Sequence, residues 1–115
     1  MAIITVMMQL GPEESAKFWP VYNEYDKALT KLGDERIAFI RMYVKNLDAL
    51  TDQKVMQIAI GMLELEGRRN QLKKEYFLRM SQTVSVKQAA RFLQIENQIE
   101  KLVDLQIAAM LPIVV

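Results

Sequence analysis

Apolar residues recur at alternating intervals of four and three over the first half of the chain. This spacing is typical of one face of an amphipathic α-helix. Gly33-Asp34 offers a possible break, but the stripe resumes in phase after Arg36. We therefore expect one long helix over about residues 12–48 rather than two shorter helices, with a kink at Pro20, which lies inside it. The stripe consists of Phe18, Tyr22, Tyr25, Leu29, Leu32, Phe39 or Ile40, Tyr43 and Leu47.

Two more stripes of the same kind predict helices over about residues 52–82 and 86–111. Thr51 and Ser85 precede them as N-cap candidates, and Ser85 stands three residues before Gln88, the spacing of a capping box. Gly61 and Gly67 weaken the first of these helices, which indicates either a closely packed neighbour or a soft segment. The stripes consist of Val55, Ile58, Ala59, Met62, Leu65, Leu72, Tyr76 and Met80, and of Phe92, Ile95, Ile99, Leu102, Val103 and Leu105.

The short breaks between these segments set the expected architecture. Loops of a few residues place consecutive helices side by side and antiparallel. Together with a helical stub over about residues 2–9, the pattern predicts an all-α fold of three long antiparallel helices in an elongated hairpin assembly. We expect a single domain over residues 1–115. Because helices this long leave apolar faces uncovered in a small chain, we also expect a homodimer, with a monomeric three-helix bundle as the alternative.

The two ends of the chain are apolar but have neither the length nor the flanks of targeting segments. Residues 1–10 carry no positive charge before their apolar run and no small-residue cleavage site, so they do not read as a signal peptide. Pro112 interrupts the apolar run of residues 107–115, and we expect no membrane insertion. The first apolar run begins without an N-cap residue, which favours a truncated first helix.

Composition and charge remove several classes of function. The 115 residues are 51% hydrophobic and 25% charged, with 15 basic and 14 acidic side chains and no Cys or His. A net charge of +1 argues against nucleic-acid binding. Without Cys and His, thiolate and imidazole chemistry is excluded, as are the usual zinc sites. Glu64 and Glu66 do not share a helix face, and we expect no enzyme, no catalytic residues, no cofactor and no metal site.

The charged residues indicate how neighbouring helices line up. A basic run over residues 68–74 lies opposite an acidic ridge of Glu96, Glu100 and Asp104 once the last two helices form a hairpin. Such exposed pairs set register more than stability, at roughly 0–1 kcal/mol each. The expected pairs are Arg68 and Arg69 with Glu100, Lys73 with Glu96, Asp26 with Lys73 or Lys74, and Arg36 with Glu64.

A group of aromatic residues near the start of the first long helix is the candidate contact site for a partner. It consists of Trp19, Tyr22 and Tyr25, beside Phe18 and Pro20. The alternative is a core anchor, with Phe18 or Trp19 buried against the last helix. The chain also has eight Met, whose side chains adapt to varied partners and bind Cu(I). Without a tight cluster of Met, core filling is the simpler interpretation.

The three helix boundaries resemble one another. They read Leu10-Gly11-Pro12-Glu13-Glu14, Leu50-Thr51-Asp52-Gln53-Lys54 and Val84-Ser85-Val86-Lys87-Gln88. Each looks like a degenerate copy of the Leu-Thr-x-x-Gln motif of the Spy/CpxP-like family of periplasmic helical proteins. Residues 18–22 and 90–97 also resemble uncharacterised bacterial members of that family.

The resemblance implies a non-enzymatic binding protein. Spy/CpxP-like proteins are small ATP-independent chaperones or envelope-stress modulators, in which helical hairpins pair into a curved dimer that holds unfolded clients. A periplasmic location follows from the resemblance alone. The alternative is a structural or regulatory homodimerisation module with one dedicated protein partner.

Overall fold

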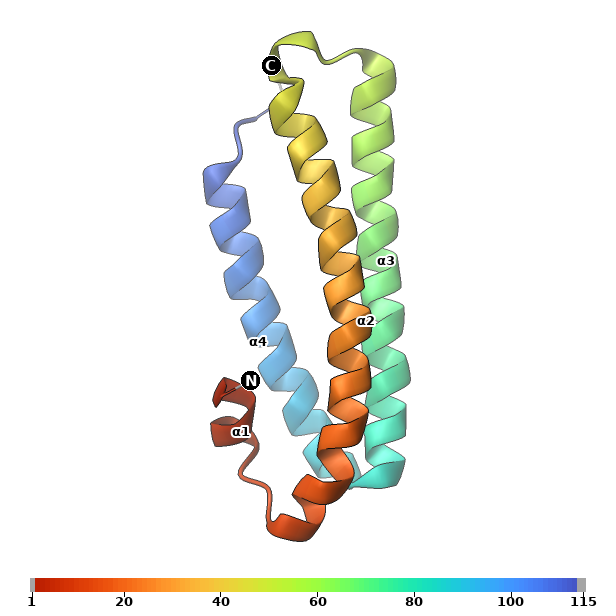
Figure 1. Ribbon diagram of the computed structural model, residues 1–115, viewed down its shortest axis with the longest axis vertical. Helices are drawn as coiled ribbons and strands as arrows, with labels where there is room; N and C mark the ends of the chain where they lie inside the picture. Colours follow the sequence, from red (N-terminus) through yellow and green to blue (C-terminus); the bar gives the residue numbers. More distant parts are fainter. Residues whose placement is uncertain (1, 114–115) are drawn as a thin grey trace.

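The computed structural model describes residues 2–113, and this part of the chain contains helices and no strand. The elements are α1 (Ala2–Met8), α2 (Pro12–Lys45), a 3-10 turn η1 (Leu47–Ala49), α3 (Asp52–Thr83) and α4 (Val86–Met110). Consecutive helices run in opposite directions, and the molecule measures 55 × 22 × 18 Å (Figure 1). The expected all-α fold of three long antiparallel helices and a short N-terminal helix is confirmed.

Helix α2 is continuous through Gly33-Asp34, as the unbroken phase of its apolar stripe predicted. Pro12 occupies its first turn, where a missing N–H costs nothing, and its first turns bend near Pro20 (Figure 1). The helix ends at Lys45, not near residue 48. The side chain of Asn46 donates to the Met42 carbonyl oxygen at 2.7 Å, and the chain then tightens into η1.

The caps of α3 and α4 lie where the sequence predicted them. The hydroxyl oxygens of Thr51 and Ser85 accept hydrogen bonds from the backbone N–H groups of Lys54 and Gln88, at 3.2 and 3.1 Å. The capping box at Ser85 is only half formed. The Gln88 side chain donates to Glu14 of α2 at 3.2 Å instead of turning back to Ser85, and it thereby joins the start of α4 to the start of α2.

The hydrophobic core lies at one end of the molecule, the end where α2 begins and where α3 meets α4. We call this the lower half, as it is drawn in Figure 1. Its aromatic rings interlock edge to face, with the ring centres of Tyr25 and Phe92 5.3 Å apart. The buried side chains of this cluster are Ile4, Met8, Phe18, Val21, Tyr22, Tyr25, Tyr76, Met80, Ala89, Phe92 and Ile95.

Helix α1 completes the lower half as a short fourth helix. It packs on α4, and its residues Ile4 and Met8 are fully buried. The chain leaves α1 through Gln9, whose positive φ of 50° is the left-handed conformation that ends many helices. Arg91 of α4 donates a hydrogen bond to the Met8 carbonyl oxygen at 3.1 Å. This carbonyl group has no partner within α1 because it lies at the end of the helix. The seven residues of α1 cover only part of the long helices, so no helix within residues 2–113 covers the upper half in the same way.

Candidate functional site

The aromatic group proposed as a contact site lies mainly inside the protein. Tyr22 and Tyr25 are buried, and their rings contact Phe92 of α4. Trp19 is half-buried at the edge of the core, with its ring centre 5.1 Å from that of Phe18. Phe18 itself is buried against Phe92, which matches the core-anchor alternative. Tyr22 and Tyr25 are therefore not available to a partner on this surface.

Burial also changes the acidity of these two tyrosines. Loss of water raises the pKa of Tyr22 to about 12, and the negative charges of Asp26 and Glu96 add to this effect. Burial raises the pKa of Tyr25 well above its usual value, with further contributions from Glu96 and Glu100. The phenol groups of both residues are therefore neutral at physiological pH in the folded protein.

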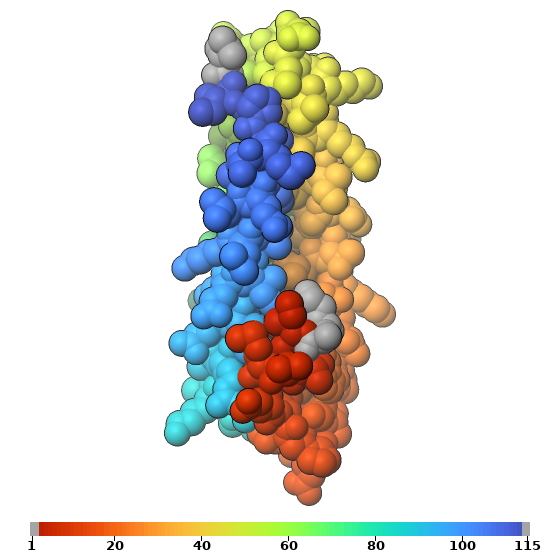
Figure 2. All heavy atoms as spheres, turned by 90° about the vertical axis from the view of Figure 1, so that its left-hand side faces the viewer, coloured from red at the N-terminus to blue at the C-terminus, as the bar shows by residue number. Residues whose placement is uncertain are grey.

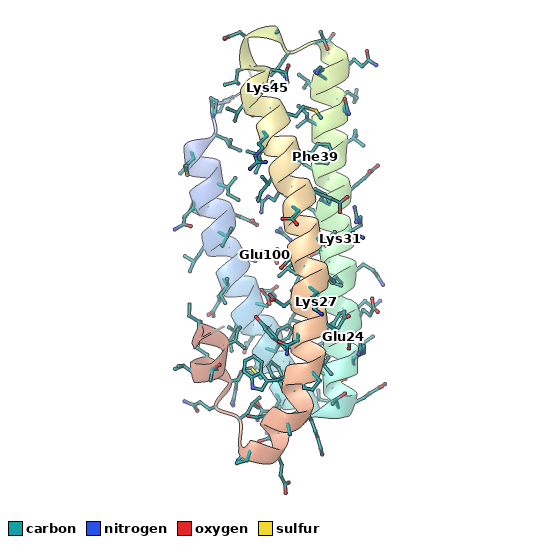
Figure 3. All side chains as sticks on the ribbon, in the orientation of Figure 1. Glu24, Lys27, Lys31, Phe39, Lys45 and Glu100 are labelled. Carbon is teal, nitrogen blue, oxygen red and sulfur yellow. The ribbon has the colours of Figure 1, made fainter. Side chains whose placement is uncertain are left out.

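Above the aromatic core, charged side chains of the three long helices meet in an ionic layer. We use this name for Arg36 of α2, Arg69 and Lys73 of α3, and Asn97, Glu100 and Asp104 of α4. Figure 3 shows Glu100 on the side of α4 that faces the other helices, where Lys73 lies 2.8 Å from one carboxylate oxygen and Arg69 3.0 Å from the other. Arg36 and Arg69 both reach Asp104, at 2.7 and 3.3 Å, and Lys73 also donates to the Asn97 side-chain oxygen at 3.0 Å.

The ionic layer confirms part of the expected register and corrects the rest. Arg69 pairs with Glu100, as predicted. Arg36 was expected to meet Glu64, but it points to α4 and binds Asp104. Arg68 was expected to meet Glu100, but it faces α2 and binds Glu35 through two hydrogen bonds of 3.0 and 2.8 Å.

The ion pairs of the other residues also differ from the prediction. Lys73 binds Glu100 and Asn97 in place of Glu96. The acidic partner from α2 on the lower part of α3 is Glu24, which pairs with Arg79, where the sequence suggested Asp26 with Lys73 or Lys74.

Glu96 is the acidic residue of this region without an ion pair among residues 2–113. It is 8% exposed, and burial raises the pKa of its carboxyl group. It borders a hollow of about 200 Å³ between α2, α3 and α4, together with apolar residues such as Leu32, Leu65 and Val103. For Asp104, in contrast, the hydrogen bond and charge of Arg36 and Arg69 outweigh the effect of burial and hold the pKa below its ordinary value.

A surface of a different kind lies on the upper half of α3, on the side that faces away from the other helices. Met56, Ile60 and Leu63 form a stripe there, which we call the outer α3 stripe, and they are 64%, 46% and 62% exposed. Ile58 and Leu65 of the same helix are buried on the opposite side. A contiguous exposed apolar patch with a polar rim, here Gln57 and Glu64, is typical of a protein-binding site.

The outer α3 stripe has a signal in the sequence that the aromatic residues do not share. Met56, Ile60 and Leu63 are separated by four and three residues, the same spacing as the core stripe of this helix. A helix with two apolar stripes on opposite sides buries one in its own fold and leaves the other for a partner. The candidate contact site predicted from the sequence was instead the aromatic group of Trp19, Tyr22 and Tyr25.

Other functional sites are not apparent in the described part of the chain. No helix within residues 2–113 combines the length and apolar character needed to cross a membrane. Across the same residues, no group of three or more acidic side chains is placed to hold a metal ion. No protein-family model matches the chain, and neither does any curated protein or solved structure.

Proposed function

We propose that the chain is a non-enzymatic protein-binding protein that holds apolar segments of unfolded proteins on the outer α3 stripe. The observation that carries this proposal is the exposure of Met56, Ile60 and Leu63 on the face of α3 opposite the core. Water-exposed apolar side chains gain free energy when they are covered, at about 25 cal/mol per Å² of apolar surface. A flexible Met beside branched residues suits clients of varied shape.

This function is that of a Spy/CpxP-like ATP-independent chaperone or envelope-stress modulator. Support for the resemblance comes from the positions of its motif copies. Gly11, Thr51 and Ser85 are the N-cap residues of the three long helices, so each copy marks the start of one helix. A periplasmic location belongs to the same proposal.

The second candidate is a structural or regulatory homodimerisation module with one dedicated partner. The spacing of the outer α3 stripe favours it, because four-three spacing is also the seam of a coiled coil. A seam of this kind is occupied permanently by one helix, whereas a chaperone surface must be free to take up many clients. The two candidates therefore differ in what binds, and a client assay separates them.

The experiment follows aggregation of a model protein whose disulfides are reduced, by light scattering, with this chain added at increasing molar ratio and without ATP. The reductant leaves this chain unchanged because it has no Cys. We expect suppression near stoichiometric ratio. The double variant Ile60→Gln/Leu63→Gln should need a several-fold higher ratio, because it removes apolar surface while leaving the core intact.

Leu78→Gln is the matched control. Leu78 is an exposed apolar residue of the same helix, but it lies in the lower half, outside the stripe. It should suppress aggregation as the natural chain does, and circular dichroism should show equal helix content in all three proteins. No suppression at several-fold excess would contradict client binding and favour the dimerisation module.

A further inference from the structure

Helix α1 is apolar on nearly all sides, with Thr5 as the polar residue of Ala2–Met8. Its inner residues Ile4 and Met8 are fully buried, while Ile3, Val6 and Met7 face solvent, with Val6 71% exposed. The sequence of α1, AIITVMM, contains no charged residue. A helix that is hydrophobic all round is normally buried on all sides. The outer face of α1 therefore lacks a cover.

The seam between α4 and α2 continues beyond α1 on the same face of the molecule, and the hollow of about 200 Å³ lined by Leu32, Ile99 and Val103 lies between these helices. Figure 2 shows α1 lying over the lower part of the seam between α4 and α2, and no other described segment lies over the seam between α1 and the end of α4. At the top, Tyr43 of α2 donates a hydrogen bond to the Pro112 carbonyl oxygen. The backbones of α2 and α4 make hardly any close approach within residues 2–113, whereas α3 packs against both. We call the upper part of this seam the open groove.

Exposure along α4 shows that the described part of the chain leaves the groove uncovered. Ile95, beside α1, is 4% exposed, whereas Leu102, two turns further along the same flank, is 64% exposed. Val103, which lines the hollow between the helices, is also exposed, and so is Ile37 of α2, the neighbour of Arg36 in the sequence. The same apolar stripe that is covered by α1 below is uncovered above.

The face is complementary to itself. It carries a protruding uncharged helix on one half and, on the other, a groove bordered by exposed apolar side chains and the Arg36–Asp104 ion pair. A two-fold axis perpendicular to the long axis of the molecule places the helix of each copy on the groove of the other, which is the geometry of an isologous dimer. Helix α1 is about 10 Å long and the groove from Ile99 to Met110 about 16 Å, at 1.5 Å per residue, so the helix fits.

Charge favours an uncharged occupant. Arg36 and Asp104 lie at this level of the bundle and already pair with each other at 2.7 Å. An uncharged helix covers them without leaving an unpaired charge, whereas a charged segment would bring one into a partly buried site. The face is 55 Å long and 18 Å wide between Cα atoms, enough for the roughly 800 Å² per partner of a stable complex.

We infer that a second copy of this chain covers this face in an antiparallel dimer, with α1 of each copy on the open groove of the other. Val6 of one copy then faces the region of Leu102 of its partner. The outer α3 stripe lies on another face and stays free in this dimer. The inference does not depend on client binding, and the two are tested by different residues.

The first test measures mass by light scattering coupled to size-exclusion chromatography. We expect the natural chain to have about twice its mass of 13.3 kDa. Val6→Lys and Leu102→Lys each place two unpaired charges in the interface, one per copy, and should raise the dimer dissociation constant at least about a hundredfold. Both positions are exposed in the single chain, so its fold should persist, which circular dichroism checks.

Leu63→Lys is the matched control, because Leu63 is exposed to nearly the same degree as Leu102 but lies on the outer α3 stripe. It should remain a dimer while losing client binding, whereas Leu102→Lys should become a monomer and keep client binding. A natural chain that stays monomeric at 100 times the concentration of the assay would overturn the inference. So would a Leu63→Lys monomer together with a Leu102→Lys dimer.

A cross-linking test fixes the orientation. The chain has no Cys, so single cysteines report only the designed contact. Val6→Cys chains mixed with tagged Leu102→Cys chains should form a disulfide-linked heterodimer on mild oxidation. Val6→Cys alone should not cross-link, because the two copies of Val6 lie far apart along an antiparallel dimer. Cross-linking of Val6→Cys to itself with none to Leu102→Cys would show a parallel arrangement and overturn the inference.

Discussion

At the residue scale, the molecule tolerates an acidic ridge that would be unfavourable in isolation. Glu96, Glu100 and Asp104 follow one another at intervals of four along α4, so their like charges lie on adjacent turns. Glu100 and Asp104 are compensated by basic residues of α2 and α3. Glu96 has no ion pair among the described residues and is the most buried of the three. Its negative charge therefore lowers the stability of the folded state the most.

Glu96→Gln should make the protein more stable at neutral and higher pH. Because the pKa of Glu96 is raised in the folded state, the folded chain holds this proton more tightly than the unfolded chain. The natural protein therefore loses stability as the pH rises from below the unfolded pKa through the folded pKa. Gln resembles the protonated carboxyl and does not ionise, so the variant should lack this loss. Urea unfolding from pH 4 to pH 8 measures it.

Asp104→Asn is the control, because it should change the free energy of unfolding in the opposite direction. The pKa of Asp104 is lowered in the folded state, so its contribution is present above the unfolded pKa and is lost as the pH falls. Asp104→Asn should therefore be less stable than the natural protein at neutral pH, and the difference should shrink toward acid. Parallel pH curves for the natural chain and Glu96→Gln would contradict the account of Glu96.

At the element scale, α3 contains two glycines that look alike in sequence and differ in structure. A Cβ atom added at Gly61 would lie 2.2 Å from the ring of Phe39 on α2, much closer than any real contact, whereas nothing lies within 4 Å of one added at Gly67. Gly61 thus permits the close approach of α2 and α3. Gly67 makes no such contact with residues 2–113, and it costs helix stability.

Substitution of these glycines by Ala should have opposite effects. Gly67→Ala should stabilise the protein by about 0.5–1 kcal/mol, the helix-propensity difference between the two residues. Gly61→Ala gains the same propensity but must displace the Phe39 ring, and overpacking costs about 1–3 kcal/mol, so we expect net destabilisation of about 1 kcal/mol. Urea unfolding measures both. The Phe39→Leu background should remove most of the penalty at Gly61, and equal gains from both substitutions would contradict a close contact there.

The helices themselves could be predicted because their signals are local. The unbroken phase of the apolar stripe predicted that α2 continues through Gly33-Asp34. The caps at Thr51 and Ser85 depend on residues within one helical turn. The ion-pair partners could be predicted only in part. The register of a hairpin predicts the height at which a residue lies along the neighbouring helix. The direction in which its side chain leaves the helix axis decides which of two neighbouring helices it contacts. Arg36 and Arg68 lie at about the expected levels and point to the other helix.

The candidate site was harder to predict because the exposure of a side chain depends on how all the helices pack together. Tyr22 and Tyr25 belong to the core stripe, and their spacing already favoured burial. Met56, Ile60 and Leu63 have the same spacing on the opposite side of α3. Which stripe of a helix is buried depends on where its neighbours lie, and that information is not local.

At the scale of the whole molecule, the core is concentrated in the lower half. Tyr76 and Met80 of α3 are buried in the aromatic cluster, while the upper half of the same helix buries few large side chains and exposes three. Local opening requires least free energy where few apolar contacts are lost. The two halves of the bundle should therefore differ in stability although the helices run through both.

Hydrogen exchange along α3 should reveal this difference. Amides of residues 57–64 should exchange at least about tenfold faster than those of residues 73–80, as measured by mass spectrometry of peptides at low protein concentration. Both segments belong to one helix and lie away from its first turn, so unsatisfied terminal amides do not contribute. Equal protection along α3 would show that the bundle opens as a single cooperative unit.

The position of Trp19 has a consequence for spectroscopy. It is the only Trp of the chain, and it lies at the edge of the aromatic core, within 5.2 Å of the Tyr22 ring centre and 5.1 Å of the Phe18 ring centre. Its emission reports on the end of the bundle that α1 closes, and it receives excitation energy from the neighbouring tyrosine. The outer α3 stripe and the open groove lie in the other half. Intrinsic fluorescence is thus a sensor of core integrity that stays silent while a client occupies the outer α3 stripe.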